Sequence, residues 1–166
     1  IVSEKIAAIR VKTNRRIAKT LIHDRPRNAL EAKFSMPFCL AIVLTERRAG
    51  LAEFTDEIVG RADVQNLISK INYSSFDKPG SDYTNVTTLL EIDFTDGKTI
   101  TGRADFAPGS TADPMGFDDV AEKFRDCADY AGWPVDKSAQ AIAMVKRLDD
   151  LENISELTRT LSVRAD

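Results

Sequence analysis

The chain has 166 residues, 43% of them hydrophobic and 30% charged, which is typical of an ordinary globular protein. Its 23 basic and 26 acidic residues give a formal net charge of -3, the wrong sign for a nucleic-acid-binding surface. No run reaches the roughly 18 to 20 consecutive apolar residues that span a bilayer, so we expect a cytoplasmic protein whose partners include neither nucleic acid nor a membrane.

The length of the chain is sufficient for one hydrophobic core, so we expect a single domain over residues 1–166. The first residue is Ile1, and no charged-then-apolar leader is present, which predicts a piece of a longer protein. Cys39 and Cys127 form no Cys-x-x-Cys pair. We interpret them as reduced structural residues and not as a disulfide or a metal site.

The first predicted element is a strand over residues 6–13, where apolar and polar residues alternate. Residues 14–22 are too short and too basic a segment to assign. Pro26 removes a backbone donor and restricts the residue before it, so residues 23–28 are expected to form a surface loop.

The longest nearly apolar run covers residues 30–44 and contains an interior proline. Within it, the spacing of Leu30, Phe34 and Phe38 predicts a buried helical face. Because Pro37 would break a continuous helix, we expect an approach segment followed by a helix with Pro37 in its first turn.

Two polar residues precede this helix. Ser35 can accept a hydrogen bond from a backbone N–H two or three residues on and so cap the helix, and we give this structural role at least as much weight as a catalytic one. Lys33 either extends to solvent, pairs with Glu31, or points its ammonium into a pocket for an anionic substrate. The residues alone favour solvent or pairing over the pocket.

Short elements are predicted after Gly50, where we expect the helical region to end. A short helix would be capped by Thr55 and carry acidic residues in its first turn. A second helix over residues 63–69 and a strand over residues 70–74 follow, and residues 76–85 have the composition of a loop.

A β-hairpin is the clearest local signal. Leu90, Ile92 and Phe94 alternate with polar residues before Asp96-Gly97, which predicts a two-residue type I′ turn with glycine supplying positive φ. The two strands are expected near residues 85–95 and 98–106.

Three helices are predicted in the last third of the chain. The apolar spacing predicts an amphipathic helix over residues 117–131 and a second one over residues 138–151. A capping box from Asn153 to Glu156 would begin a last helix that ends near Ser162. Together the elements predict an α+β fold, a small mostly antiparallel sheet with helices packed on one side.

The usual catalytic motifs are absent from the sequence, including a P-loop, a dinucleotide fingerprint and a His-Glu-x-x-His helix. With one histidine, a catalytic triad or a metal cluster is disfavoured, and we interpret His23 as an exposed loop residue. Carboxylate pairs such as Asp118-Asp119 are typical of solvated helix ends.

Residues 31–38, Glu-Ala-Lys-Phe-Ser-Met-Pro-Phe, together with Phe54-Thr-Asp-Glu57, resemble the second-domain signature of the MmgE/PrpD family. Residues 9–13 resemble the family's preceding strand, and Arg25-Pro-Arg27 its approach loop. The later helix entry, at Pro114 and Glu122-Lys-Phe124, is also similar. The resemblance covers residues 5–130.

The family includes 2-methylcitrate dehydratase, cis-aconitate decarboxylase and iminodisuccinate epimerase. The resemblance therefore implies a lyase or isomerase for a small di- or tricarboxylate that uses neither a metal nor an organic cofactor. It also implies an N-terminal helical domain, an active site between the two domains, and a homodimer of the intact protein. This piece of the protein is expected to be inactive alone.

The resemblance places Lys33, Ser35 and Phe38 near the substrate pocket. The catalytic residues remain unknown, because the family's upstream Lys and His have no counterpart in the sequence. Many members carry a tyrosine where Phe38 stands, and a phenyl ring cannot donate a hydrogen bond. The alternative is a non-catalytic interaction or dimerisation module derived from the family, and either reading predicts an exposed apolar patch.

Overall fold

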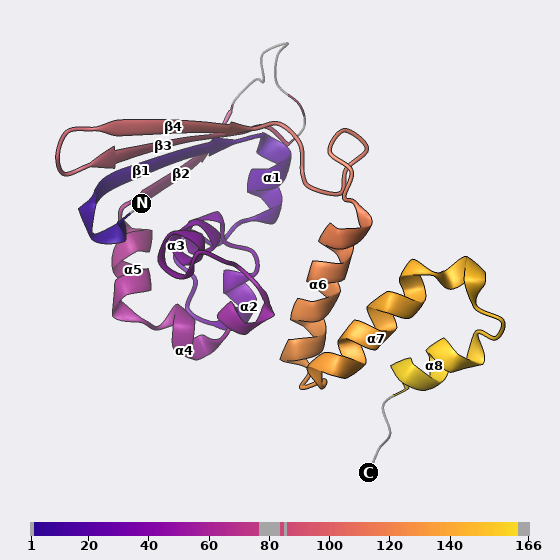
Figure 1. The fold of residues 1–166 in the computed structure, drawn as a ribbon. Helices are drawn as coiled ribbons and strands as arrows, with labels where there is room; N and C mark the ends of the chain where they lie inside the picture. Colours follow the sequence, from indigo (N-terminus) through magenta and orange to yellow (C-terminus); the bar gives the residue numbers. More distant parts are fainter. Residues whose placement is uncertain (1, 77–83, 85, 163–166) are drawn as a thin grey trace. The chain divides into compact units, whose positions relative to one another are not determined.

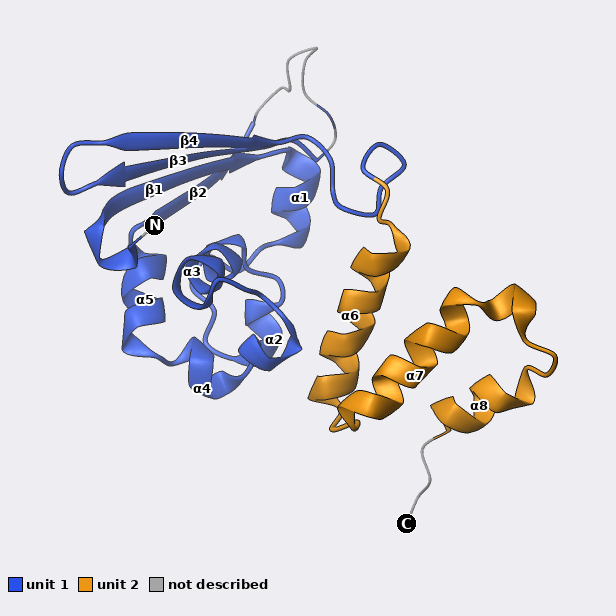
Figure 2. Cartoon of the chain, in the orientation of Figure 1, with its two compact units in different colours: residues 1–113 blue, residues 114–166 orange. Residues whose placement is uncertain are grey.

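A computed structural model describes residues 2–76, 84 and 86–162 of the chain. The chain divides into two compact units, residues 1–113 and residues 114–166, which Figure 2 shows in different colours. Each unit is described by itself, and the expectation of a single domain over residues 1–166 stays a prediction. None of the described helices is long and apolar enough to cross a membrane.

Unit 1 is built on a four-stranded sheet with the order β2-β1-β3-β4. The strands are β1 (Ile6–Thr13), β2 (Ile71–Ser75), β3 (Thr88–Phe94) and β4 (Thr99–Ala104). β1 pairs in parallel with β2, whereas the β1–β3 and β3–β4 pairs are antiparallel. The predicted α+β class with a mostly antiparallel sheet is confirmed.

Helices α1 to α5 of unit 1 lie on one side of this sheet (Figure 1). Their bounds are α1 (Arg15–Thr20), α2 (Ala29–Ala32), α3 (Met36–Glu46), α4 (Asp56–Val59) and α5 (Ala62–Ser69), and the 3-10 turns η1 (Ser3–Lys5) and η2 (Leu51–Glu53) complete the unit. Asn14, the first residue of the segment that the sequence left unassigned, caps α1 by accepting a hydrogen bond from the backbone N–H of Arg16 at 2.9 Å.

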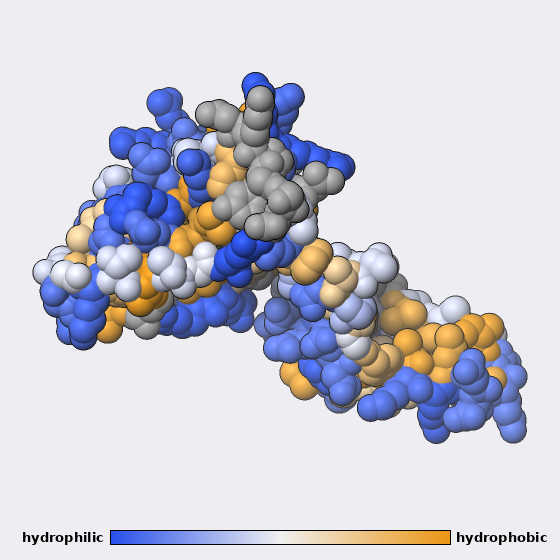
Figure 3. All heavy atoms as spheres, turned by 90° about the horizontal axis from the view of Figure 1, so that it is seen from above, coloured by the Kyte–Doolittle hydropathy of each residue, from blue (hydrophilic) through white to orange (hydrophobic). Residues whose placement is uncertain are grey.

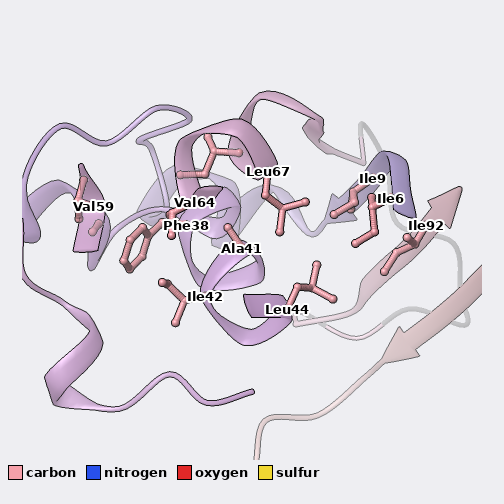
Figure 4. Close-up of a cluster of buried hydrophobic side chains, with 12 residues drawn as sticks. Ile6, Ile9, Phe38, Ala41, Ile42, Leu44, Val59, Val64, Leu67 and Ile92 are labelled. Atoms are coloured by element: carbon pink, nitrogen blue, oxygen red, sulfur yellow. The ribbon is translucent and has the colours of Figure 1, made fainter. Parts of the chain in front are cut away.

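The hydrophobic core of unit 1 joins the inner face of the sheet to helices α3 and α5 (Figure 4). Alternate residues of β1 point inward, so Ile9 and Val11 are buried while Arg10 and Lys12 are exposed. The buried cluster consists of Ile6, Ile9, Ala32, Phe38, Ala41, Ile42, Leu44, Val59, Val64, Leu67, Ile68 and Ile92.

Helix α3 begins as predicted. The hydroxyl of Ser35 accepts a hydrogen bond from the backbone N–H of Phe38 at 3.2 Å, and Pro37 lies in the first turn. The prediction that Leu30 and Phe34 continue the buried face of Phe38 is wrong, because their side chains are 68% and 43% exposed. The extended backbone of Ser35 (φ -127, ψ 110) separates α2 from α3, so the helical spacing does not carry across it.

The helix ends earlier than expected. Its C-cap is Arg47, which adopts the left-handed conformation with φ 63, three residues before Gly50. A left-handed residue commonly terminates a helix, although glycine is the more usual choice. Thr55 caps α4 as predicted, because its side chain accepts a hydrogen bond from the backbone N–H of Ile58 at 3.2 Å.

The predicted hairpin is present, but its turn differs from the expected type. The backbone N–H of Phe94 donates to the carbonyl of Lys98 at 2.8 Å, and Gly97 N–H donates to the carbonyl of Phe94 at 3.0 Å. Gly97 has φ 85, whereas Asp96 does not have positive φ, which a type I′ turn requires at both central positions. The turn is therefore a three-residue loop over residues 95–97.

Unit 2 consists of helices α6 (Phe117–Tyr130), α7 (Val135–Lys146) and α8 (Ser155–Leu161), with a 3-10 turn, η3 (Leu148–Asp150), between the last two. The first helix agrees with its prediction to within one residue. The second begins three residues earlier than expected and ends before η3. The predicted capping box is wrong, because α8 has Ile154 as its N-cap without a side-chain cap bond, and the Asn153 side chain accepts from the N–H of Ser155 at 2.9 Å and not from that of Glu156.

The outer face of the sheet carries charged side chains that pair across the strands. Figure 3 views this face, where hydrophilic atoms surround a narrow hydrophobic area. Asp93 accepts hydrogen bonds from the hydroxyl of Thr99 at 2.7 Å and from Arg10, whose guanidinium lies 2.6 Å away. The bond from Thr99 and then the one from Arg10 lower the pKa of Asp93 below its usual range.

We predict that replacing Ser35 by alanine lowers the free energy of unfolding by about 1–2 kcal/mol, because the buried N–H of Phe38 loses its acceptor. Urea denaturation followed by circular dichroism measures this change. Ser74→Ala is the control, since Ser74 is exposed and its hydroxyl bonds to none of the described residues. Equal stability of the two variants would contradict a capping role for Ser35.

A second prediction concerns the stability of the fold at low pH. A carboxyl whose pKa is lowered by folding stabilises the fold above the unfolded-state pKa, and that stability is lost as the pH falls through the folded-state pKa. We therefore expect the urea midpoint to decline below about pH 4 and the decline to be shallower in Asp93→Asn. Glu57→Gln, at an exposed position in α4, is the control and should keep the wild-type slope.

Candidate functional site

The segment that precedes α3 is exposed but held by specific hydrogen bonds. The side chain of Asn28 accepts from the N–H of Glu31 at 2.9 Å, and the Glu31 carboxylate accepts from the N–H of Arg27 at 2.7 Å. The carboxylate of Asp56, in α4, accepts from the N–H of Ala29 at 2.7 Å. These bonds hold the backbone of α2 and of the loop before it in place.

The same segment is closed on itself by one backbone contact. The N–H of His23 donates to the carbonyl of Phe34 at 3.1 Å, which brings the start of the loop beside the end of α2. His23 is half-buried, so the expectation of an exposed loop residue is only partly met. No group of three His, Cys, Asp or Glu side chains in the described ranges could hold a metal ion. Cys39 and Cys127 are both free thiols.

The structure does not bring together the three residues that the sequence places near a substrate pocket. Lys33 is exposed at the C-cap of α2. Of the alternatives left open for it, pairing with Glu31 is not formed, and the carboxylate of Glu31 instead accepts from the backbone N–H of Arg27. Ser35 and Phe38 are both fully buried. Their assignment to a pocket stays a prediction.

Phe38 is a core residue of unit 1. Its side chain has 0% exposure, and its ring centroid lies 5.3 Å from that of Phe54 with an interplanar angle of 54°. Figure 4 shows the ring among aliphatic side chains such as Val64. The aromatic ring at this position therefore stabilises the packing of α3. This packing role does not depend on the hydroxyl that a tyrosine at the same position would carry.

Residues 22–34 expose both cationic and apolar side chains, and we call this exposed set the junction surface. Its cations are Arg25, Arg27 and Lys33, each exposed and without an ion pair to any residue that the structure describes. Its exposed apolar residues are Ile22, Leu30 and Phe34. Guanidinium and ammonium groups free of internal partners can bind carboxylates, whereas apolar residues beside them favour contact with another molecule or domain.

A polar crevice lies beside the junction surface and was not expected from the sequence. It has a volume of about 240 Å³ and is lined by the loop residues Asp24 and Arg25, by Pro37 of α3, and by residues of β2. Among these is Tyr73, whose hydroxyl lies 3.2 Å from that of Thr13. Burial raises the pKa of Tyr73, the hydrogen bond to Thr13 opposes this, and the charge of Asp24 adds to it, so the phenol stays protonated.

Comparisons with known proteins point to the same family as the motif in residues 31–38. The family model described as MmgE/PrpD C-terminal domain matches residues 2–150, a range that crosses the boundary between the two units. Human cis-aconitate decarboxylase is 28% identical over 135 residues, which cover 79% of this chain and 27% of the human protein. The mouse protein of the same name is 27% identical over 136 residues, covering 82% and 28%. The chain thus spans little more than a quarter of the length of these relatives.

We predict that Phe38→Tyr lowers the free energy of unfolding by about 1–3 kcal/mol, because the added hydroxyl would be buried among apolar side chains. Phe54→Tyr is the matched control, since its ring is adjacent but partly exposed and its hydroxyl can reach water. Urea denaturation of both variants gives the comparison. An unchanged stability for Phe38→Tyr would show that the ring edge borders an open cavity and would favour a pocket role.

Proposed function

The chain belongs to the MmgE/PrpD family, as its C-terminal domain, and from this premise we propose that it forms one side of an active site for a small di- or tricarboxylate. The observation that carries the proposal is the junction surface, which covers the approach loop and the start of the family motif and holds three cations without an ion pair to any described residue. A substrate with two or three carboxylates requires such groups for binding.

The proposed reaction is a lyase or isomerase step at a carbon next to a carboxylate. Such a step needs a base placed at that carbon and cationic or hydrogen-bonding groups that stabilise the developing charge. The described part of the chain supplies cations at the junction surface, and its only histidine, His23, is tied to Phe34 through its backbone. We therefore place the base in an N-terminal helical domain of the intact protein, and we expect the chain to be inactive alone.

Within this proposal the intact protein is a cytoplasmic homodimer that needs no cofactor. The relatives named above are decarboxylases, which supports a lyase more directly than an isomerase. An epimerase or racemase of the same family would use the same cations, because it too develops negative charge beside a carboxylate.

A second function, a non-catalytic interaction or dimerisation module, is favoured by unit 2. Its buried residues are mostly small, such as Ala121, Ala128 and Ala141. Larger apolar side chains remain exposed and border an apolar groove of about 200 Å³ between α6, α7 and α8, namely Phe117, Val120, Val145 and Leu161. An apolar surface of this kind is typical of a site that another protein or domain covers.

The experiment that separates the two functions uses the complete protein and the 166-residue chain side by side. Each is assayed with 2-methylcitrate, cis-aconitate and iminodisuccinate, and binding is measured by calorimetry. We expect the complete protein to convert one of these acids and the isolated chain to convert none. If the complete protein neither binds nor converts any small polycarboxylate, the enzyme proposal is wrong, and self-association in light scattering would then support the module.

A further inference from the structure

One edge of the sheet in unit 1 is formed by β4, which ends the strand order β2-β1-β3-β4 (Figure 1). All six of its residues, Thr99–Ala104, are exposed. Strand β3 pairs with one side of β4, and no strand in the described part of the chain pairs with the other side. An open edge of this kind presents backbone donors and acceptors that can pair with another strand.

The hairpin shows which residues of β4 face the open edge. The backbone N–H of Phe94 donates to the carbonyl of Lys98 at 2.8 Å, so these two residues form a hydrogen-bonded pair. In an antiparallel ladder such pairs alternate with pairs that are not hydrogen-bonded. Thr99 and Thr101 fall out of phase with the first pair in the continuous register of β3 and β4. Their backbone groups therefore point away from β3.

The strand lacks the features that usually protect an edge. Proteins discourage edge pairing with a proline, a β-bulge or a charged side chain on the inner face. The sequence of β4, Thr-Ile-Thr-Gly-Arg-Ala, contains no proline, and its register with β3 runs without a shift over residues 88–93. Ile100 lies opposite the buried Ile92, so Ile100, Gly102 and Ala104 form an uncharged inner face. The edge of β4 is therefore open to a further strand.

A second copy of β4 fits this edge in one symmetric register. A two-fold axis perpendicular to the sheet keeps each side chain on its own face, and opposite residues of antiparallel strands share a face. The axis must therefore pass beside a residue that lies opposite its own equivalent. This residue must also have backbone groups that point to the open edge. Thr101 meets both conditions, and centring the axis on it pairs the whole stretch over residues 99–103.

This register also matches the side chains of the two copies. Thr101 lies opposite its equivalent, and threonine pairs of this kind stabilise antiparallel strands. Ile100, which is 41% exposed, lies opposite Gly102 of the other copy, where the absence of a side chain leaves room for it. Arg103 lies opposite Thr99 of the other copy, so no like charges face each other within the paired stretch.

We propose that β4 pairs antiparallel with β4 of a second copy of this chain, with Thr101 on the two-fold axis, so that two four-stranded sheets form one continuous sheet. The proposal rests on the homodimer proposed above and names its contact, and it does not depend on the enzymatic reaction. A contact made by one six-residue strand is small. We therefore expect the isolated chain to show a monomer–dimer equilibrium that depends on concentration.

Cysteine cross-linking tests the register. In a chain whose two thiols are removed by Cys39→Ala and Cys127→Ala, Thr101→Cys should form a disulfide-linked dimer on mild oxidation. Its two Cα atoms would lie about 5.5 Å apart, within the roughly 4.4–6.8 Å that a disulfide spans. Thr99→Cys is the matched control on the same strand and face, because its two Cα atoms would lie roughly 14 Å apart. Electrophoresis without reductant gives the comparison.

Thr101→Pro tests the hydrogen bonds across the edge. Because the N–H of Thr101 points away from β3, the strand should accept proline, as sheet edges do. Each copy would lose one donor of the reciprocal pair, so the dissociation constant measured by sedimentation should rise at least about tenfold. Thr101→Val keeps the N–H and the β-branched shape, and it should leave the constant unchanged. Circular dichroism reports whether each variant is folded, and if Thr101→Pro is unfolded the cross-linking comparison decides alone.

Three results would overturn the proposal: a chain that sediments as a monomer at every concentration, equal cross-linking of Thr101→Cys and Thr99→Cys, or equal dissociation constants for folded Thr101→Pro and Thr101→Val. Sedimentation of the complete protein tests the homodimer separately. If the complete protein is a dimer while Thr101→Cys does not cross-link, the contact is wrong and the homodimer stands. If the chain cross-links at Thr101 while the complete protein is a monomer, the edge pairing stands and the homodimer is wrong.

Discussion

The structure of unit 1 depends on the apolar contact between α3 and the inner face of the sheet. β1 occupies an interior position and pairs with a strand on each side, so the side chains of Ile6 and Ile9 are covered only because helices pack beneath them. Phe38 and Ile42 of α3 belong to the same buried cluster. The start of the helix, set by Ser35, therefore determines which residues enter the core.

The packing of α3 on the sheet also gives the residues of the family motif two different roles. Within residues 31–38, Ser35 and Phe38 are buried: Ser35 caps α3 and Phe38 packs in the core. Lys33 is exposed to solvent. A motif can thus reflect folding and function at once, since the buried members hold the exposed ones in place. The charged groups available to a ligand lie at the surface of this segment and in the loop before it, above all at Arg25.

Elements of the fold could be predicted from the sequence where they depend on residues close together in the chain. The cap at Ser35, the strand β3 and the helix α6 each depend on neighbours within a few residues, and the sequence predicted the cap and the approximate bounds of both elements correctly. The exposure of Leu30 depends instead on one extended residue between two helices. The crevice is formed by a loop, a helix and a strand that are far apart in the sequence. Local patterns in a single sequence do not predict that such distant segments lie side by side.

The position of β1 has a consequence for synthesis on the ribosome. Ile9 pairs with Ile71 on one side and with Ile92 on the other, so β1 has no partner until β2 has been made and one free side until β3 has been made. Sheets formed from such distant pairings close slowly, and an unpaired apolar strand is prone to aggregation meanwhile. The nascent chain must therefore keep the strand from associating with other molecules until β3 has emerged, whereas the α6–α7 hairpin can form as soon as it is synthesised.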